Sequence, residues 1–328
     1  MAKTLDTKLS KIAAGRYAPT DFIIADAKDG DMAFGCQTAG LDTTTGRFRS
    51  ITAYRDDMKR VVSSGLVDIM LMSVSSGEIL TDQNIFADSA VTPAVRYNDT
   101  TDIWHPRGNT YNPGQALPFR TARLDRVAPI TDLGLYSMTF YNDLIRDHDT
   151  LEHYCRFRDQ ASDLNLRHFL EVFNPNYNVT CGDHDFGAFN NDMIVRTLAG
   201  VAKRDRPVFL KAAYNGPRAT EEIAGYDPHN IIFGILGGAA GTTRDCLELI
   251  KQAEKYGARV ALFGRKIYYS EDSVTMLRAM RRVLEDGISS AEATKAYHAD
   301  LAAQGIAPHR DLADDLELTE AILKPNVV

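Results

Sequence analysis

Lys211 is the residue whose neighbours point most directly to chemistry. It lies in the run PVFLKAAY at 207–214, which is mostly apolar and is closed by the turn Asn-Gly-Pro at 215–217. A short apolar run closed by a turn is typical of a buried strand, and a lysine is almost never fully buried without a partner. Lys211 therefore either extends to solvent or takes part in a reaction.

The reaction open to a buried lysine is condensation with a carbonyl group. The amine attacks only when it is neutral, and burial and neighbouring cations favour the neutral form. It then forms a Schiff base with a ketone or aldehyde, and the iminium draws electrons from an adjacent carbon–carbon bond, which can break or form. Proton transfer in these steps requires a carboxylate or a phenol close by. The candidates for this transfer are Glu171, Asp26 and Tyr136.

Glu171 has surroundings much like those of Lys211. It lies in the run HFLEVF at 168–173 with apolar residues on both sides, so we expect both side chains to point inward. A buried lysine and a buried carboxylate at the same end of a sheet would neutralise each other. The same two groups would also supply a nucleophile and a proton-transfer group.

A glycine-rich segment, GGAAGTT at 237–243, follows another apolar run and precedes a helical pattern. Glycines let backbone N–H groups approach a ligand closely, and a helix start favours an anion. The segment lacks the Lys-Ser/Thr of a phosphate-binding P-loop and the GxGxxG spacing of a dinucleotide site. The residues expected to bind an anionic group are Gly237, Gly238, Gly264, Arg265, Lys28 and Arg96.

Metal-dependent chemistry is the alternative for the same region. Asp183 and His184, together with Glu171, would offer ligands, but no second histidine follows at ligand spacing. We therefore expect no metal and no cofactor.

The elements that must position these residues are predicted from the recurrence of strand, turn and helix. We expect a (β/α)₈ TIM barrel in a single domain, with a long loop insertion at 98–128 and a peripheral C-terminal extension at 305–328. An open, doubly wound sheet with an extra domain is the alternative. The expected strands are 22–26, 67–73, 91–97, 132–140, 168–173, 207–214, 230–236 and 259–263. The expected helices are 49–65, 144–163, 189–203, 242–256, 271–285 and 290–304.

A barrel would bring the candidate residues to one place. Active sites in TIM barrels lie at the carboxyl ends of the strands, and phosphate sites frequently use the loops after strands seven and eight. Gly237-Gly238 would follow strand seven, and Gly264-Arg265 would follow strand eight. Lys211 would end strand six, so the three features reinforce one another.

Composition and charge exclude several classes of protein. The net charge of −7 argues against a nucleic-acid partner. No run of eighteen apolar residues and no signal-like start are present, so we expect no membrane partner. The four cysteines are far apart and form no CxxC pair, which fits reduced thiols and a cytoplasmic location.

The chain resembles the class I, Schiff-base aldolases of the deoxyribose-phosphate, tagatose-bisphosphate and sulfofructose-phosphate aldolase group. The resemblance covers about residues 20–270 in order and spacing. There are departures: lysine stands at 28 where arginine is usual, Ala-Ala-Tyr follows the strand-six lysine, and the strand-four lysine of some members is absent, with Tyr136 or Ser137 nearby. The matching motifs are Asp26 after Ile24-Ala25, Leu170-Glu171, Leu210-Lys211, Gly237-Gly238 and Gly264-Arg265.

The resemblance implies a lyase that cleaves or forms a carbon–carbon bond in a phosphorylated or otherwise anionic ketose. Lys211 would be the nucleophile, Glu171 the proton shuttle, and Asp26 a positioning group. A related barrel with the same lysine performs a thiolase-like acyl transfer, so the reaction type stays open. We expect a homo-oligomer. The alternatives are a sugar-phosphate-binding regulatory protein without turnover and a metal-dependent barrel lyase.

Overall fold

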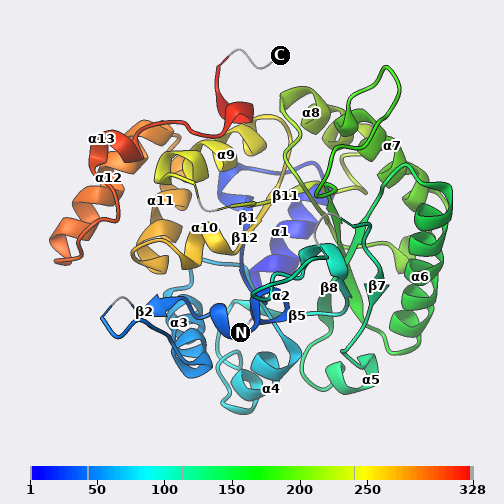
Figure 1. Cartoon of the computed structure of the whole chain (residues 1–328), viewed down its shortest axis with the longest axis horizontal. Coiled ribbons are helices and arrows are strands. Elements are labelled where there is room, and N and C mark those ends of the chain that lie inside the picture. The colour runs from blue at the N-terminus through cyan, green and yellow to red at the C-terminus, as the bar shows by residue number, and fades with distance from the viewer. Residues whose placement is uncertain (1, 43, 112–113, 240, 326–328) are drawn as a thin grey trace.

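Eight parallel strands close into a barrel in the order β1-β4-β5-β8-β9-β10-β11-β12, which confirms the predicted (β/α)₈ TIM barrel. The computed structural model describes residues 2–42, 44–111, 114–239 and 241–325. Figure 1 shows the strands in the middle of the molecule and the helices around them. The strands are β1 (Ile23–Lys28), β4 (Ile69–Met72), β5 (Thr92–Arg96), β8 (Leu133–Thr139), β9 (Arg167–Phe173), β10 (Leu210–Ala212), β11 (Gly234–Leu236) and β12 (Val260–Phe263).

The helices start and end where local chemistry favours it. The Ser50 hydroxyl accepts the Ala53 N–H at the start of α3, and Gly65 ends α3 with a φ of +66°, which favours glycine. The helices are α1 (Thr4–Ala13), α2 (Asp31–Phe34), α3 (Ile51–Ser64), α4 (Val74–Asp82), α6 (Leu144–Asp163), α7 (Phe186–Ala199), α8 (Pro217–Tyr226), α9 (Thr243–Lys255), α10 (Arg265–Tyr268), α11 (Ser273–Glu285) and α12 (Ser290–Ala303).

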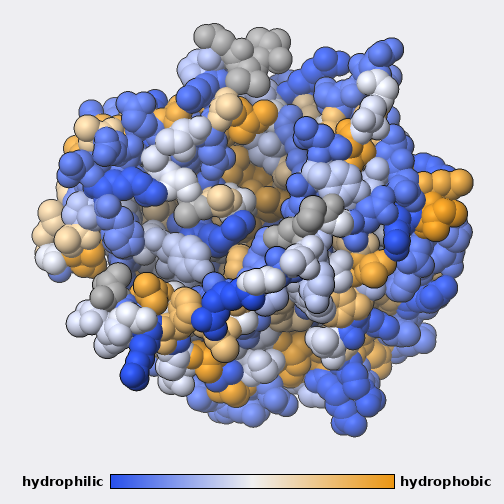
Figure 2. Space-filling view, in the orientation of Figure 1, coloured by the Kyte–Doolittle hydropathy of each residue, from blue (hydrophilic) through white to orange (hydrophobic). Residues whose placement is uncertain are grey.

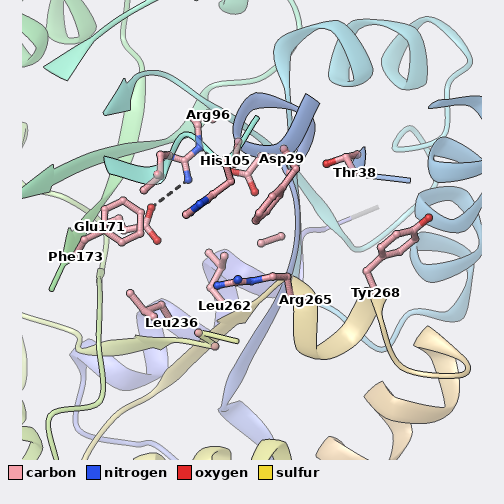
Figure 3. A pocket seen from close by; sticks show the side chains of 18 of the residues that line it. Asp29, Thr38, Arg96, His105, Glu171, Phe173, Leu236, Leu262, Arg265 and Tyr268 are labelled. Carbon is pink, nitrogen blue, oxygen red and sulfur yellow. Dashed lines mark hydrogen bonds and ion pairs between the residues drawn. The ribbon is translucent and has the colours of Figure 1, made fainter. Parts of the chain in front are cut away.

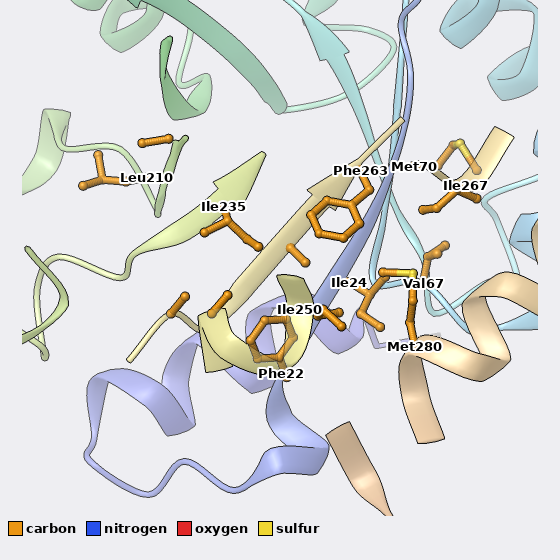
Figure 4. Packing of buried hydrophobic residues seen from close by; sticks show 14 of the residues in the cluster. Phe22, Ile24, Val67, Met70, Leu210, Ile235, Ile250, Phe263, Ile267 and Met280 are labelled. Atoms are coloured by element: carbon orange, nitrogen blue, oxygen red, sulfur yellow. The ribbon is translucent and has the colours of Figure 1, made fainter. Parts of the chain in front are cut away.

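Alternate residues of each strand face opposite sides of the barrel wall. Ile23, Ala25 and Leu262 belong to the cluster that fills the interior, and Leu5 and Ile12 of α1 join this cluster. The outward residues pack against the helices, as Figure 4 shows for Ile24 of β1, Ile250 of α9 and Met280 of α11. This alternation decides which polar side chains enter the barrel mouth.

The segment 98–128, expected to be a long loop insertion, contains short elements of its own. β6 (Asp99–Thr100) pairs antiparallel with β7 (Pro118–Phe119). Between them lies η3 (Thr101–Ile103), and α5 (Leu124–Val127) follows. Residues 112–113 lie outside the described part.

The described part of the C-terminal extension expected at 305–328 packs against the outer helices of the barrel. It contains α13 (Leu312–Asp315) and η5 (Ala321–Leu323). Asp315 is 2% exposed and Leu323 is fully buried. The Asp315 carboxylate accepts the Thr243 N–H at the start of α9 at 2.7 Å. Residues 326–328 lie outside the described part.

The molecular surface is largely hydrophilic on the face of Figure 2, and it is hollowed near the centre, above the barrel. Within the described residues, no helix combines the length and the apolar character needed to cross a membrane. The hollow leads to the carboxyl ends of the strands, where the candidate side chains meet.

Candidate active site

A cavity of about 240 Å³ opens at the carboxyl end of the barrel (Figure 3). Residues of β1, β5, β9, β10, β11 and β12 line it, together with α2 and the segment that follows β6. Lining residues used in the argument below are Asp29, Phe34, Arg96, Asp102, His105, Glu171, Lys211, Gly237, Gly238, Gly264, Arg265 and Tyr268. The position of Lys211 in this cavity shows whether its side chain extends to solvent or is available for a reaction.

Lys211 is buried beside a carboxylate. It is 6% exposed, Glu171 is 1% exposed, and their side chains form a short ion pair. The two residues are register partners on β10 and β9, and Ser137 of β8 is the register partner of Glu171. Because partners in register face the same side, the three side chains meet at one level of the barrel interior. Lys211 therefore does not extend to bulk solvent.

Arg96 of β5 completes this polar cluster. Its guanidinium donates to Glu171 Oε2 at 3.2 Å and to Ser137 Oγ at 2.6 Å, and its Nε donates to Asp29 Oδ2 at 2.6 Å. The Ser137 hydroxyl donates to Glu171 Oε2 at 2.9 Å. Figure 3 marks the contact between Arg96 and Glu171 with a dashed line. The carboxylate of Glu171 is thus fixed on one oxygen, while Lys211 contacts the other.

The charges in this cluster shift one another's pKa values. Burial alone would raise the pKa of Asp29, but the charges of Arg96 and Lys211 outweigh it and hold that pKa below its usual value. Burial opposes the charge of Arg96, yet Asp29 and Glu171 raise its pKa overall. Asp29 and Arg96 are therefore both charged at neutral pH.

The predicted anion-binding glycines and Arg265 all line the same cavity. Gly238 has a φ of +65°, and a Cβ at Gly264 would lie 2.7 Å from the carbonyl oxygen of Ala27. Both positions thus require glycine, and both expose backbone to the cavity. Burial lowers the pKa of Arg265, whose guanidinium lies 5.6 Å from the Phe34 ring centroid. No described carboxylate forms an ion pair with Arg265.

The start of α9 is closed by protein groups, contrary to the expectation that it would bind an anion. The Thr243 N–H donates to Asp315, and the Thr242 N–H donates to Asp245 at 3.1 Å. The Asp245 N–H donates in turn to the Thr242 hydroxyl. Of the residues expected to bind an anion, the glycines at 237–238 and 264, Arg265 and Arg96 line the cavity.

The predicted placement of Asp26 and Lys28 in the cavity is wrong. Both lie on the outward face of β1, with no exposure, and Lys28 Nζ is 3.0 Å from Asp26 Oδ2 and 3.1 Å from Asp57 Oδ2 of α3. Burial raises the pKa of Asp26 to about 6, although Lys28 opposes the shift. Asp29 directly follows β1 and faces inward, on the same side as Ile23 and Ala25 of the strand. Its carboxylate lines the cavity.

The predicted placement of Tyr136 in the cavity is wrong for the same reason. Its ring stacks on Phe157 of α6 at 4.3 Å between centroids, on the outer side of β8. Burial raises its pKa. The neighbouring Ser137 faces inward and contacts Glu171 instead.

The metal ligands considered from the sequence do not form a site. Asp183 and His184 are exposed in the segment before α7, whereas Glu171 is held by Lys211 and Arg96. Among the described residues, no group of three or more histidine, cysteine, aspartate or glutamate side chains could hold a metal ion.

Sequence reasoning missed two residues that line the cavity, Asp29 and His105, and it missed the contact of Ser137 with Glu171. Strand register could have found Ser137, because it lies beside Glu171 once β8 and β9 are aligned. The segment around His105 carries no periodicity that would place it over the barrel mouth.

Comparison with known proteins supports the fold. No family model and no curated protein matches the chain. A Schiff-base-forming fructose-1,6-bisphosphate aldolase has a TM-score of 0.60 and 16% identity over 85% of this chain and 99% of its own. An archaeal fructose-1,6-bisphosphate aldolase, with its catalytic lysine bound to a carbinolamine intermediate, has a TM-score of 0.60 and 15% identity over 85% and 99%.

A fructose-bisphosphate aldolase from Slackia heliotrinireducens DSM 20476 has a TM-score of 0.63 and 12% identity over 94% of this chain and 92% of its own. The structural neighbours thus include class I aldolases built on a TIM barrel. At these identities the likeness shows the fold. The narrower resemblance to the deoxyribose-phosphate and tagatose-bisphosphate group stays a prediction.

Proposed function

We propose that this chain is a class I aldolase or lyase. It would cleave or form a carbon–carbon bond in a phosphorylated or otherwise anionic ketose through a Schiff base at Lys211. The observation that carries the proposal is a buried lysine, in contact with a buried carboxylate, in a cavity that also contains Arg265 and exposed glycine backbone. The aldolases among the structural neighbours support the same reaction class.

The first steps of the reaction follow from the contacts of Lys211. Transfer of its proton to Glu171 yields a neutral amine, which adds to the ketose carbonyl to give a carbinolamine. Glu171 returns the proton to the carbinolamine hydroxyl, and water leaves as the iminium forms. Arg96 and Ser137 hold Glu171 in place throughout, and they limit its motion without contacting the amine.

Binding of the anionic group would fix the carbonyl over Lys211. Arg265 supplies a charge without a carboxylate partner among the described residues, and Gly238 and Gly264 let the ligand approach the backbone. Such positioning turns the addition into an effectively unimolecular step. We expect the anionic end of the substrate to lie at Arg265 and its sugar chain to extend toward Lys211.

Borohydride trapping tests the proposal. Dihydroxyacetone phosphate and a panel of ketose phosphates should each be reduced onto the wild-type chain, with the added mass on Lys211 by peptide mass spectrometry. Lys211→Met should abolish trapping and lower cleavage by at least about a thousandfold. Lys59→Met, on the outer surface of α3, is the matched control and should trap normally. Trapping that persists in Lys211→Met would overturn the assignment.

A further inference from the structure

The segment between β6 and β7 forms one wall of the cavity and is anchored on the β8 side. Asp102 accepts hydrogen bonds from the Thr139 hydroxyl at 2.8 Å and from the Tyr141 hydroxyl at 3.0 Å. The Tyr141 oxygen also accepts the Ala116 N–H at 2.8 Å. Trp104 packs edge-on against Phe119, with ring centroids 4.6 Å apart. These contacts hold both arms of the segment to the barrel.

The same segment is anchored on the opposite side, next to β1. The His105 N–H donates to the carbonyl oxygen of Ala33 at 2.8 Å, and the Gln37 amide donates to the His105 carbonyl oxygen at 3.3 Å. The His105 ring stacks on Phe34 at 5.2 Å between centroids with an interplanar angle of 14°. The segment therefore crosses the barrel mouth, and His105 is placed by its backbone and by its ring.

His105 projects into the cavity that contains Lys211. Figure 3 shows its ring in the space framed by Glu171, Arg96 and Arg265. Among the described residues that line the cavity, it is the only histidine. His105 and Lys211 thus line the same cavity.

Cleavage of the carbon–carbon bond needs a base that Lys211 and Glu171 do not provide. After the iminium has formed, the hydroxyl on the carbon two bonds from it must lose its proton as the bond breaks. This hydroxyl lies beyond the iminium carbon, away from the Lys211–Glu171 contact. A separate acceptor must therefore face it from the cavity wall.

The carboxylates of the cavity are already engaged. Asp29 binds Arg96, and the pKa of Asp29 lies below its usual value for that reason. Glu171 binds Lys211 as well as Arg96. Asp102 accepts hydrogen bonds from the Thr139 hydroxyl and from the phenol of Tyr141. Each of these carboxylates is thus held by contacts with other side chains.

The phenols of the cavity are poor acceptors. Burial raises the pKa values of Tyr54 and Tyr269, and it raises that of Tyr268 to about 12. Burial lowers the pKa of His105, and the charge of Arg265 lowers it further, while Asp102 opposes the shift. The imidazole is therefore largely neutral at pH 7 and able to accept a proton.

Resting on the proposed function, we propose that His105 is the catalytic base for carbon–carbon bond cleavage, supplied by the segment that crosses the barrel mouth. The imidazole takes the hydroxyl proton, the hydroxyl oxygen becomes the carbonyl oxygen of the departing aldehyde, and the carbon–carbon bond breaks. Its electron pair moves to the iminium nitrogen, which gives an enamine on Lys211. The imidazolium returns the proton to the enamine carbon, and hydrolysis releases the second product.

The test separates imine formation from bond cleavage. His105→Gln should form the borohydride-trapped adduct of dihydroxyacetone phosphate on Lys211 as wild type does. Its cleavage of the best ketose phosphate of the panel should fall by about 10² to 10⁴-fold. His105→Ala should regain part of this activity when imidazole is added. His153→Gln is the matched control, because His153 lies on α6 away from the cavity.

Each outcome decides between the two proposals. Normal trapping with cleavage within twofold of wild type in His105→Gln would overturn the role of His105 and leave the Schiff-base function standing. A parallel loss of trapping and cleavage, with no rescue by imidazole, would also overturn it, because it would show a structural role. Absence of trapping in the wild type would remove both proposals. Circular dichroism melts of each variant confirm that it is folded.

Discussion

Arg96 is the residue on which the charge balance of the cavity depends. Its side chain is 6% exposed and contacts Asp29 and Glu171, both of which are buried. An unpaired buried carboxylate is costly. Arg96 carries one positive charge and contacts two carboxylates, so Lys211 is needed to balance the second negative charge. The ion pair between Lys211 and Glu171 thus belongs to a network of four charged groups. In the proposed reaction, a carbonyl substrate would enter this network by forming an iminium with the Lys211 amine.

Asp26 gives a pH dependence that is separate from the cavity. Burial raises its pKa from 3.8 to about 6 in the folded chain. The folded state therefore binds the proton more tightly than the unfolded state, and this contribution is fully present below pH 3.8 and lost as the pH rises through about 6. Asp26→Asn removes the titration, so its free energy of unfolding relative to wild type should rise across this window, by on the order of 3 kcal/mol.

Urea unfolding of wild type and Asp26→Asn at several pH values between 3.5 and 7, roughly the window set by the linkage relation, measures this difference. Asp56→Asn is the control, since Asp56 is exposed on the same helix that supplies Asp57. A difference in unfolding free energy that stays flat, or that falls with pH, would contradict the assignment.

The sequence could identify Lys211 and Glu171 but not the inward face of β1. Strands buried on both faces read as continuous apolar runs and do not show which side faces the interior. In β1, Ile23 faces the interior and Ile24 faces the helices, so the two sides look alike. The sequence therefore does not show that Asp29, and not Asp26, faces the cavity. The same holds for Ser137 and Tyr136, because both faces of β8 are buried.

At the scale of elements, the eight strands and six of the helices are predictable because short apolar runs and helical patterns follow one another along the chain. The two segments at 98–128 and 305–328 are not, because their positions depend on individual contacts with residues far away in the sequence. Asp102 holds the first segment, through Thr139, and Asp315 holds the second, through Thr243. A contact of this kind leaves no periodic pattern.

Asp315 connects the C-terminal segment to the start of α9, and its loss should destabilise the fold. Its carboxylate accepts the Thr243 N–H and lies 2.9 Å from His298 Nε2. Asp315→Ala leaves the buried N–H without a partner, so we expect a loss of about 1–3 kcal/mol in the free energy of unfolding. Asp314→Ala changes the exposed neighbour and should cost less than about 0.5 kcal/mol. Urea denaturation at pH 7 compares the two, and equal midpoints would contradict the role of Asp315.

At the scale of the whole molecule, the start of α6 exposes two adjacent aliphatic side chains. Leu144 is 82% exposed and Ile145 is 72% exposed at the start of this helix. Figure 2 shows an apolar patch over α6 at the right edge of a largely hydrophilic face. Burial of adjacent, largely exposed aliphatic side chains against another protein surface is energetically favourable. The homo-oligomer expected from the sequence stays a prediction, and this apolar patch is the surface that we expect to form its interface.

Replacing Leu144 and Ile145 together by glutamate tests that prediction. If two copies of the chain meet through α6, each interface buries the two side chains, and introducing four charges there should weaken association by at least about a hundredfold. Sedimentation velocity over a concentration series measures the shift toward monomer. Tyr226→Glu on α8, another exposed apolar position, is the matched control and should leave association unchanged. Because the patch lies outside the cavity, borohydride trapping at Lys211 should persist in the monomer. A wild-type chain that sediments as a monomer, or a double variant that associates as wild type does, would exclude this surface as the interface.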